Sequence, residues 1–449
     1  MKPFFTLPDP DITQESSLDP MGMQVIWTHY GQAIFQDKLT TVANNLRAFT
    51  FNLFHAHLIN RLFQEHPEEL ALAKEQFTNW KTEVDIKTGL LIFLEDLVTW
   101  IFYDAQQSSN NRDLHGLGTL GLNKARLADN SGKPIVLTAN KNAGLLKYQL
   151  NLGMTGRYKG PMTQMGFFNR NFEIKYAQNP QWDKVEKLIR NWNEGSNLQT
   201  HLLKLITENL FKSNRKDWPQ ILKGEIETHD IWKSVSKGYI DSFGSRKQTK
   251  EIRAFWKDKL GLMSGAASAL YEEISKLKPG EAINRFHIFN EAVKNKTIES
   301  DELEKLKSVI AVEPFLSHTE FLLRYLAQNN TKNLSDHLTE IEQLRSEIER
   351  ASKFDLKKAP EQLQKLHSYA TTKGNTQDWV KQIITYHKVI MQQRGGNVWC
   401  EMNDEGQFKH YFSPRFSESV NTIPKYLNER PWLHSYYLET LQSIHTGFN

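Results

Sequence analysis

The sequence has 449 residues, which is long for one hydrophobic core and fits about two to four compact units. Its 24% charged and 39% hydrophobic residues are ordinary for globular proteins and exclude wholesale disorder. The single cysteine, Cys400, excludes an internal disulfide framework and a cysteine-rich zinc site. The net charge is only +4, but residues 116–170 carry eight Lys and Arg against one acid, so this segment is expected to attract a polyanion.

Residues 1–20 are punctuated by Pro8, Pro10 and Pro20 and are predicted to form an extended leader. They lack a basic region followed by an apolar core, so we expect no secretory signal. The most apolar stretch, 86–103, is interrupted by Lys87, Glu95 and Asp96 and is too short to span a bilayer. We therefore expect a cytoplasmic protein that makes no membrane contact.

An N-terminal helical bundle is predicted over 21–110. Apolar residues recur at helical spacing over 32–64, and Pro67 is placed to end that helix and to open a second one over 68–84. A third helix, over 86–107, is apolar on most sides, so it is expected at the centre of the bundle.

A glycine-rich basic module is predicted over 111–178. Apolar residues at helical spacing over 145–152 end at Gly153, and the element that follows presents basic residues at its start. A helix, a glycine turn and a second short element are typical of a helix-turn-helix motif. Arginine and lysine there would neutralise phosphates, and tyrosine would donate a hydrogen bond or stack on a base. The residues predicted to contact nucleic acid in this module are Lys141, Lys147, Arg157, Tyr158 and Lys159.

The central region, 179–295, is predicted to be helical and contains a second group of basic residues. Four of them share one face of a helix, where they would follow a phosphate backbone. A solvated helix face that also carries Glu251 and Asp258 explains the same pattern and remains an alternative. The four are Arg246, Lys250, Arg253 and Lys257.

An acidic helical arm is predicted over 296–375, with helices over 315–328 and 334–350 forming an antiparallel pair. The stripe on the second helix is too short for a long coiled coil, so we expect a packed arm.

The C-terminal segment, 376–449, is predicted to contain a helix, a β-hairpin and a last helix. The first helix, 376–393, is followed by a glycine stop, and short alternating runs flank a turn at 403–406. The last helix is expected over 432–445. The sequence as a whole predicts a mainly α protein of multi-helical bundles, with a small C-terminal β-hairpin and a glycine-rich basic insert.

Two patterns resemble catalytic or cofactor motifs but lack the context that these motifs need. The GxGxxG run at 116–121 has no strand before it and no acid about 20 residues further on, so a dinucleotide site is not expected. Glu173 and Lys175 have the Glu-x-Lys spacing of some metal-dependent nucleases, but no acid lies between Asp129 and Glu173. His55 and His57 point to different faces of a helix. We therefore predict no catalytic residue, no metal and no cofactor.

The basic segments favour a non-enzymatic component of an intracellular multi-protein assembly that engages nucleic acid, DNA before RNA. A bacterial antiviral defence system is one setting for such a chain, although no motif specifies it. A helical adaptor that contacts only proteins, and a metal-dependent nuclease around Glu173, remain alternatives.

Overall fold

The structure is a computed structural model, and it describes residues 19–108, 119–146, 148–175, 179, 181–193, 197–213, 216–244, 249–328, 331–412 and 422–448. Within them the chain forms two compact units. Unit 1 comprises residues 1–35 and 264–438, and unit 2 comprises residues 36–263 and 439–449. The boundaries between the units do not coincide with those of the six predicted segments, because they fall inside the predicted segments 21–110, 179–295 and 376–449. The predicted bundle and basic module lie largely in unit 2.

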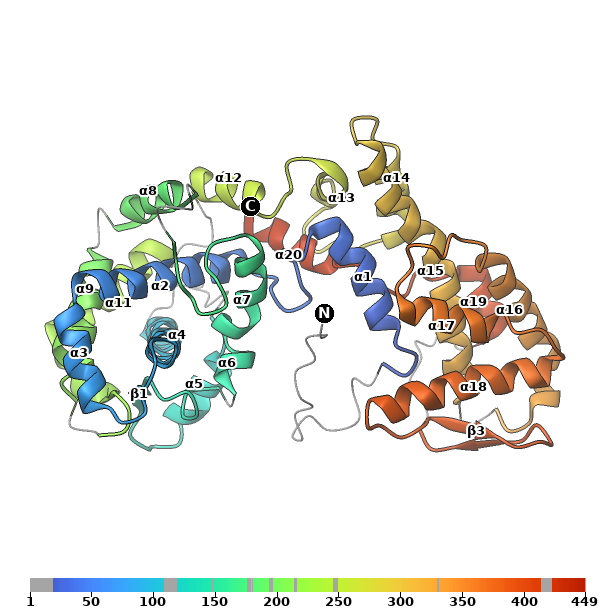
Figure 1. The fold of residues 1–449 in the computed structure, drawn as a ribbon, viewed down its shortest axis with the longest axis horizontal. Helices are drawn as coiled ribbons and strands as arrows, with labels where there is room; N and C mark the ends of the chain where they lie inside the picture. The colour runs from blue at the N-terminus through green and yellow to red at the C-terminus, as the bar shows by residue number, and fades with distance from the viewer. Residues whose placement is uncertain are drawn as a thin grey trace. The chain divides into compact units, whose positions relative to one another are not determined.

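The described residues are mainly helical, as predicted, with two small antiparallel sheets of two strands each (Figure 1). No helix among them is long and apolar enough to cross a membrane.

Unit 1 is a helical assembly with one β-hairpin. Its elements are α1 (Met23–Phe35), α13 (Gly265–Ser275), α14 (Arg285–Val293), α15 (Ser300–Leu326), a 3₁₀ turn (Leu334–His337), α16 (Leu338–Ala351), α17 (Glu361–Ala370), α18 (Thr376–Gln393), β3 (Cys400–Met402), β4 (Phe408–His410) and α19 (Ile423–Glu429). The predicted pairing of α15 with α16 and the predicted hairpin are both confirmed. Asn375 caps α18 through the backbone N–H of Asp378, and Gly395 ends the helix with φ of +68°.

A buried ionic network joins α15 to the segment that precedes α20. The imidazole of His434 lies between Glu313 and Glu320, with both N–O distances 2.9 Å. Burial alone would lower the pKa of His434, but the two carboxylates outweigh it and raise that pKa to about 10. The Tyr436 hydroxyl also donates to Glu313, at 2.7 Å. His434 is therefore a buried imidazolium with a carboxylate on each side.

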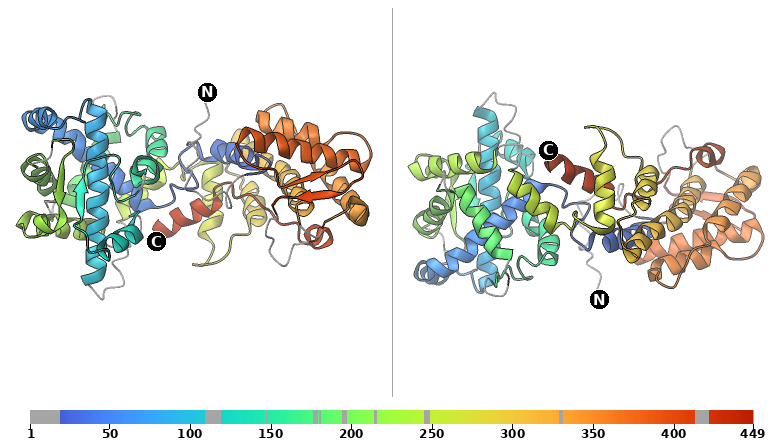
Figure 2. Two further views of the ribbon diagram at one scale, coloured as in Figure 1. Left: turned by 90° about the horizontal axis from the view of Figure 1, so that it is seen from below. Right: turned by 90° about the horizontal axis from the view of Figure 1, so that it is seen from above.

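Unit 2 is built around one central helix. Its elements are α2 (Leu46–Glu65), α3 (Pro67–Gln76), α4 (Glu83–Ser108), α5 (Leu122–Asp129), β1 (Val136–Thr138), α6 (Gln149–Leu152), α7 (Met154–Gln164), α8 (Gln181–Asn193), α9 (Leu198–Lys204), a π-helix (Leu205–Leu210), β2 (Gln220–Leu222), α10 (Lys223–Glu227), α11 (Asp230–Phe243), α12 (Lys250–Lys259) and α20 (Leu438–Phe448), which begins on the last residue of unit 1. Residues 86–103 of α4 are all buried, as the apolar pattern predicts. Figure 1 views α4 end-on, with α2, α5, α6 and α7 around it, and Figure 2 shows it from the side.

The two histidines of α2 belong to the core of unit 2. The ring of His55 is hydrogen-bonded to the Tyr239 hydroxyl at 2.9 Å, and the ring of His57 stacks on Trp182. Burial lowers the pKa of His55 to about 3, so its ring is neutral at physiological pH. Both side chains therefore stabilise packing rather than form a shared metal site.

Several predicted boundaries were wrong. The helix expected over 32–64 is broken between α1 and α2, because residues 36–45 form a non-helical segment with positive φ at Gln36 and Asp37. The last helix begins at 438 rather than 432, because residues 431–435 are held in an extended segment by the His434 network.

Candidate nucleic-acid interface

Two adjacent carboxylates of α4 hold the glycine-rich basic module in place. Gln149 donates from Nε2 to Glu95 Oε2 at 3.1 Å and to Asp96 Oδ1 at 2.8 Å. The backbone N–H of Leu145 donates to Asp96 at 3.0 Å, and that of Thr155 donates to Glu95. Both carboxylates are buried, so these donors provide the hydrogen bonds that water would otherwise supply. We call these five residues the carboxylate clamp.

Glycines make this close approach possible. A Cβ atom at Gly144 would lie 2.5 Å from Gln149 Oε1, and one at Gly153 would lie 2.5 Å from the Gln149 carbonyl oxygen. Both distances are far below an ordinary contact, so a larger residue at either position would displace Gln149, and at Gly153 it would also clash with Glu95 of α4. The glycines that mark this segment in the sequence therefore serve packing at these two positions.

The carboxylate clamp should respond to pH. Burial raises the pKa of Glu95 and of Asp96 to about 7, although the hydrogen bonds from Gln149 and the backbone lower both. A raised carboxyl pKa means that the folded state binds more protons than the unfolded state. The contribution of the clamp to stability should therefore fall as pH rises from about 4 to about 7.

This pH dependence is measured by equilibrium unfolding in urea at pH 5 and pH 8, for the wild type and for the double variant Glu95→Gln/Asp96→Asn. From pH 5 to pH 8 the unfolding free energy should fall more in the wild type than in the variant, because the variant has no titrating carboxyl groups at the clamp. Identical changes would show that these carboxyls do not titrate in this range.

Helix α7 presents two cations that have no acidic partner among the described residues. Arg157 donates from Nε to the Leu152 carbonyl oxygen at 2.9 Å, and Lys159 lies over the ring of Phe172 with Nζ 4.3 Å from its centroid. Burial lowers the pKa of Lys159, and the nearby positive charge of Arg170 lowers it further. Two like charges are thus held close together, which favours the binding of an anion.

Tyr158 does not lie on the surface, and this part of the prediction was wrong. Its ring packs edge-on against Phe49, and its hydroxyl accepts a hydrogen bond from the backbone N–H of Asn45 at 2.9 Å. The side chain is 2% exposed, and burial raises its pKa to about 12. The reason is visible in the sequence, because Met154, Tyr158 and Met162 recur every four residues and form the buried stripe of α7.

Among the described residues of this region, the exposed tyrosine is Tyr148, which the sequence reasoning missed. Its side chain is 46% exposed, and Leu152, one helical turn further on, is 39% exposed. Tyr148 has φ of +58°, a left-handed conformation that is rare for a bulky residue and that recurs at functional sites. The aromatic side chain of this surface is therefore contributed by α6 rather than α7.

The other predicted contacts have different surroundings. Lys141 pairs with Asp85 at 3.4 Å. Arg253 donates to the Phe448 carbonyl oxygen at 2.8 Å, and Lys257 lies over the Phe448 ring, so both hold α20 against α12. Lys250 is exposed. Lys147 and Arg246 lie outside the described residues, as does the glycine run at 116–118.

The predicted helix-turn-helix geometry is not observed. The helix expected over 145–152 is reduced to the single turn of α6, and Pro161 lies inside α7 rather than in its first turn. One turn is too short to be the first helix of that motif. What remains of the prediction is Gly153, which separates α6 from α7.

The remaining site candidates do not form a catalytic arrangement within the described residues. The side chain of Glu173 accepts a hydrogen bond from Asn169 at 2.5 Å, and the described part of the chain holds no group of three or more His, Cys, Asp or Glu suited to a metal ion. Within the part of the chain that the structure describes, Glu173 is therefore not a member of such a group.

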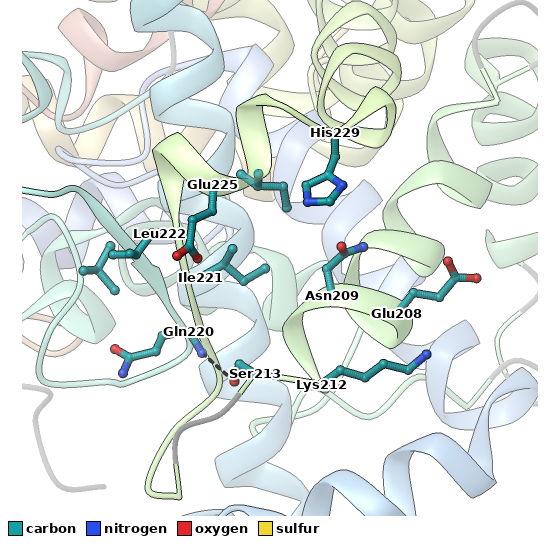
Figure 3. Close-up of a pocket in the computed structure, with 11 residues that line it drawn as sticks. Glu208, Asn209, Lys212, Ser213, Gln220, Ile221, Leu222, Glu225 and His229 are labelled. Carbon is teal, nitrogen blue, oxygen red and sulfur yellow. Dashed lines mark hydrogen bonds between the residues drawn. The ribbon is translucent and has the colours of Figure 1, made fainter.

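A surface pocket of about 440 Å³ lies beside β2, between this strand, the π-helix and α10. Figure 3 shows Glu208 and Lys212 extending away from β2, on the side opposite Gln220 and Leu222. Glu208, Lys212 and His229 are exposed to solvent. The lining of this pocket therefore carries polar side chains that are accessible to solvent.

No protein-family model, curated protein or solved structure matches this chain.

Proposed function

We propose that this protein is a non-enzymatic, nucleic-acid-binding component of a multi-protein assembly, with DNA as the first ligand to test. The observation that carries the proposal is that Arg157 and Lys159 of α7 have no acidic partner among the described residues, on a segment fixed to the core by the carboxylate clamp. We call Arg157, Lys159 and Arg170 the cationic surface.

The chemistry of this surface suits phosphate. An arginine donates several hydrogen bonds in a fixed plane and a lysine acts as a compact point charge, and both contact phosphate oxygens in nucleic-acid complexes. Lys159 and Arg157 have no acidic partner among the described residues, so no ion pair has to break before they bind. Weak binding that depends on salt is expected, with a Kd on the order of 1–100 µM at physiological salt.

Charge reversal at Arg157 and Lys159 should weaken binding strongly. The double variant Arg157→Glu/Lys159→Glu should weaken binding of a labelled oligonucleotide at low salt on the order of tenfold or more, because attraction to phosphate becomes repulsion. The milder double variant Arg157→Gln/Lys159→Gln removes both charges without introducing acids near Phe172. Fluorescence anisotropy measures the affinity.

A matched control changes the same net charge elsewhere in unit 2. Lys74 on α3 and Lys212 after the π-helix are both exposed, so Lys74→Glu/Lys212→Glu should keep most of the affinity. Equal losses in the control and in the α7 variants would mean that only the overall charge matters. Absence of binding by the wild type at low salt would overturn the proposal.

The two alternatives make different predictions. A protein adaptor should retain a fixed partner in a pull-down after nuclease treatment, and its partner binding should be insensitive to the α7 variants. A nuclease should cleave DNA or RNA with Mg²⁺ or Mn²⁺ and lose this activity on Glu173→Ala.

A further inference from the structure

Hydrogen bonds to the backbone of α6 link Arg157 to the exposed Tyr148. The carbonyl oxygen of Tyr148 accepts the backbone N–H of Leu152 at 3.0 Å, so Tyr148 and Leu152 are one turn apart. The carbonyl oxygen of Leu152 in turn accepts from Arg157 Nε at 2.9 Å. The guanidinium group of Arg157 therefore contacts the backbone of Leu152, one helical turn after the exposed Tyr148.

The backbone at Tyr148 supports a role beyond packing. A left-handed conformation costs a bulky residue free energy that glycine or asparagine would avoid. Burial does not offset this cost fully, because the side chain is 46% exposed. The tyrosine instead keeps an aromatic side chain in reach of solvent.

Aromatic side chains beside cations are the arrangement by which proteins bind single-stranded nucleic acid. An unpaired base offers a free face that stacks on the ring, while the cations contact the backbone phosphates. The bases of a duplex are already stacked on their neighbours, so a surface tyrosine gains little from them.

On the basis of the proposed function, we infer that the surface at Tyr148 and Arg157 selects single-stranded over double-stranded nucleic acid, with an unpaired base stacked on Tyr148 and an adjacent phosphate bound by Arg157. Stacking does not distinguish the sugar, so single-stranded DNA and single-stranded RNA are both ligands of this chemistry.

The test compares one labelled sequence as single-stranded DNA, single-stranded RNA and duplex DNA at one low salt concentration. The wild type should bind both single strands more tightly than the duplex. Tyr148→Asn suits the left-handed backbone but removes the ring, and it should weaken single-strand binding between about 5- and 150-fold while changing duplex binding little. Tyr148→Phe should retain the affinity.

An equally exposed tyrosine provides the control. Tyr411 in unit 1 is 50% exposed, and Tyr411→Asn should leave single-strand binding unchanged. The unfolding free energy of Tyr148→Asn, measured in parallel, should not fall, because asparagine tolerates positive φ.

The outcomes separate this inference from the proposed function. No binding of any of the three ligands overturns both. Binding that is as tight for duplex as for single strands, or that is unchanged by Tyr148→Asn, overturns the single-strand preference and leaves phosphate binding by the cationic surface standing. Preference for one single strand over the other identifies DNA or RNA as the ligand.

Discussion

Replacement of His434 by alanine is expected to lower the unfolding free energy of unit 1 by about 3–5 kcal/mol. The reason is that two buried carboxylates, Glu313 and Glu320, would lose the cation between them, and an unpaired buried charge is costly. Arg324 would remain bound to Glu320, but Glu313 would keep only neutral donors, among them Tyr436 at 2.7 Å. Chemical denaturation followed by hydrogen exchange of the α15 amides measures the loss in unit 1 specifically.

Backbone strain adds to the expected effect. Tyr436 and Tyr437 follow His434 with φ of +45° and +64°, conformations that bulky residues adopt only when their surroundings impose them. The backbone N–H groups of Leu433 and His434 both donate to Glu313, so the network fixes the segment just before these strained residues.

The control for this experiment is an exposed ion pair in the same unit. Glu361 and Lys365 form an i, i+4 pair on α17, and Glu361→Ala should change the unfolding free energy little, because water screens this exposed pair. The pH dependence provides a second check. The pKa of His434 is raised, so its contribution is complete below about pH 6.5 and is lost as pH rises toward 10. A His434→Ala variant with wild-type stability would show that the network is not a stabilising element.

Replacement of Gly153 by alanine is expected to destabilise unit 2 by about 3 kcal/mol and to weaken nucleic-acid binding with it. The φ of Gly153 is −72°, so an alanine would adopt the backbone conformation without strain. The cost would come from the new Cβ atom, which would lie 2.5 Å from the Gln149 carbonyl oxygen and 3.0 Å from Gln149 Cγ. The hydrogen bonds of Gln149 to the two carboxylates of α4 would then be distorted.

Gly160 is a matched control on the same helix, and it should give the opposite sign. No atom lies within 4 Å of a Cβ built there, and the position is inside α7. Gly160→Ala should therefore stabilise unit 2 by about 0.5–1 kcal/mol through helix propensity alone. Equilibrium unfolding measures the unfolding free energy of both variants. Equal changes at positions 153 and 160 would show that the carboxylate clamp does not fix the module.

The parts of the fold that follow from local pattern were predicted well. The apolar run of α4, the pairing of α15 with α16 and the C-terminal hairpin all follow from residue spacing that one element satisfies by itself. The break between α1 and α2 was missed because apolar residues continue across it, and Leu39 is buried in a non-helical segment. Asn45, which caps α2 through two backbone N–H groups, was the signal for the correct start.

The candidate site was predicted only in part, because exposure depends on contacts between distant residues. Arg253 and Lys257 share a helix face with Lys250, as expected, but Phe448 lies against them from nearly 200 residues further along the chain. From the sequence, Glu95 and Asp96 are predicted only to interrupt the apolar stretch 86–103. Buried carboxylates need hydrogen-bond donors, and the polar segment that follows α4 in the chain supplies them through Leu145 and Gln149.

The salt dependence of nucleic-acid binding tests the central claim most directly. The account predicts that the logarithm of the association constant falls linearly with the logarithm of salt concentration, because phosphate contacts release counterions. The slope should become shallower by about 0.7–0.9 for each contact removed, and so by about 1.4–1.8 in Arg157→Gln/Lys159→Gln. A slope that is the same in this variant and in the wild type would contradict the assignment of phosphate binding to the α7 surface.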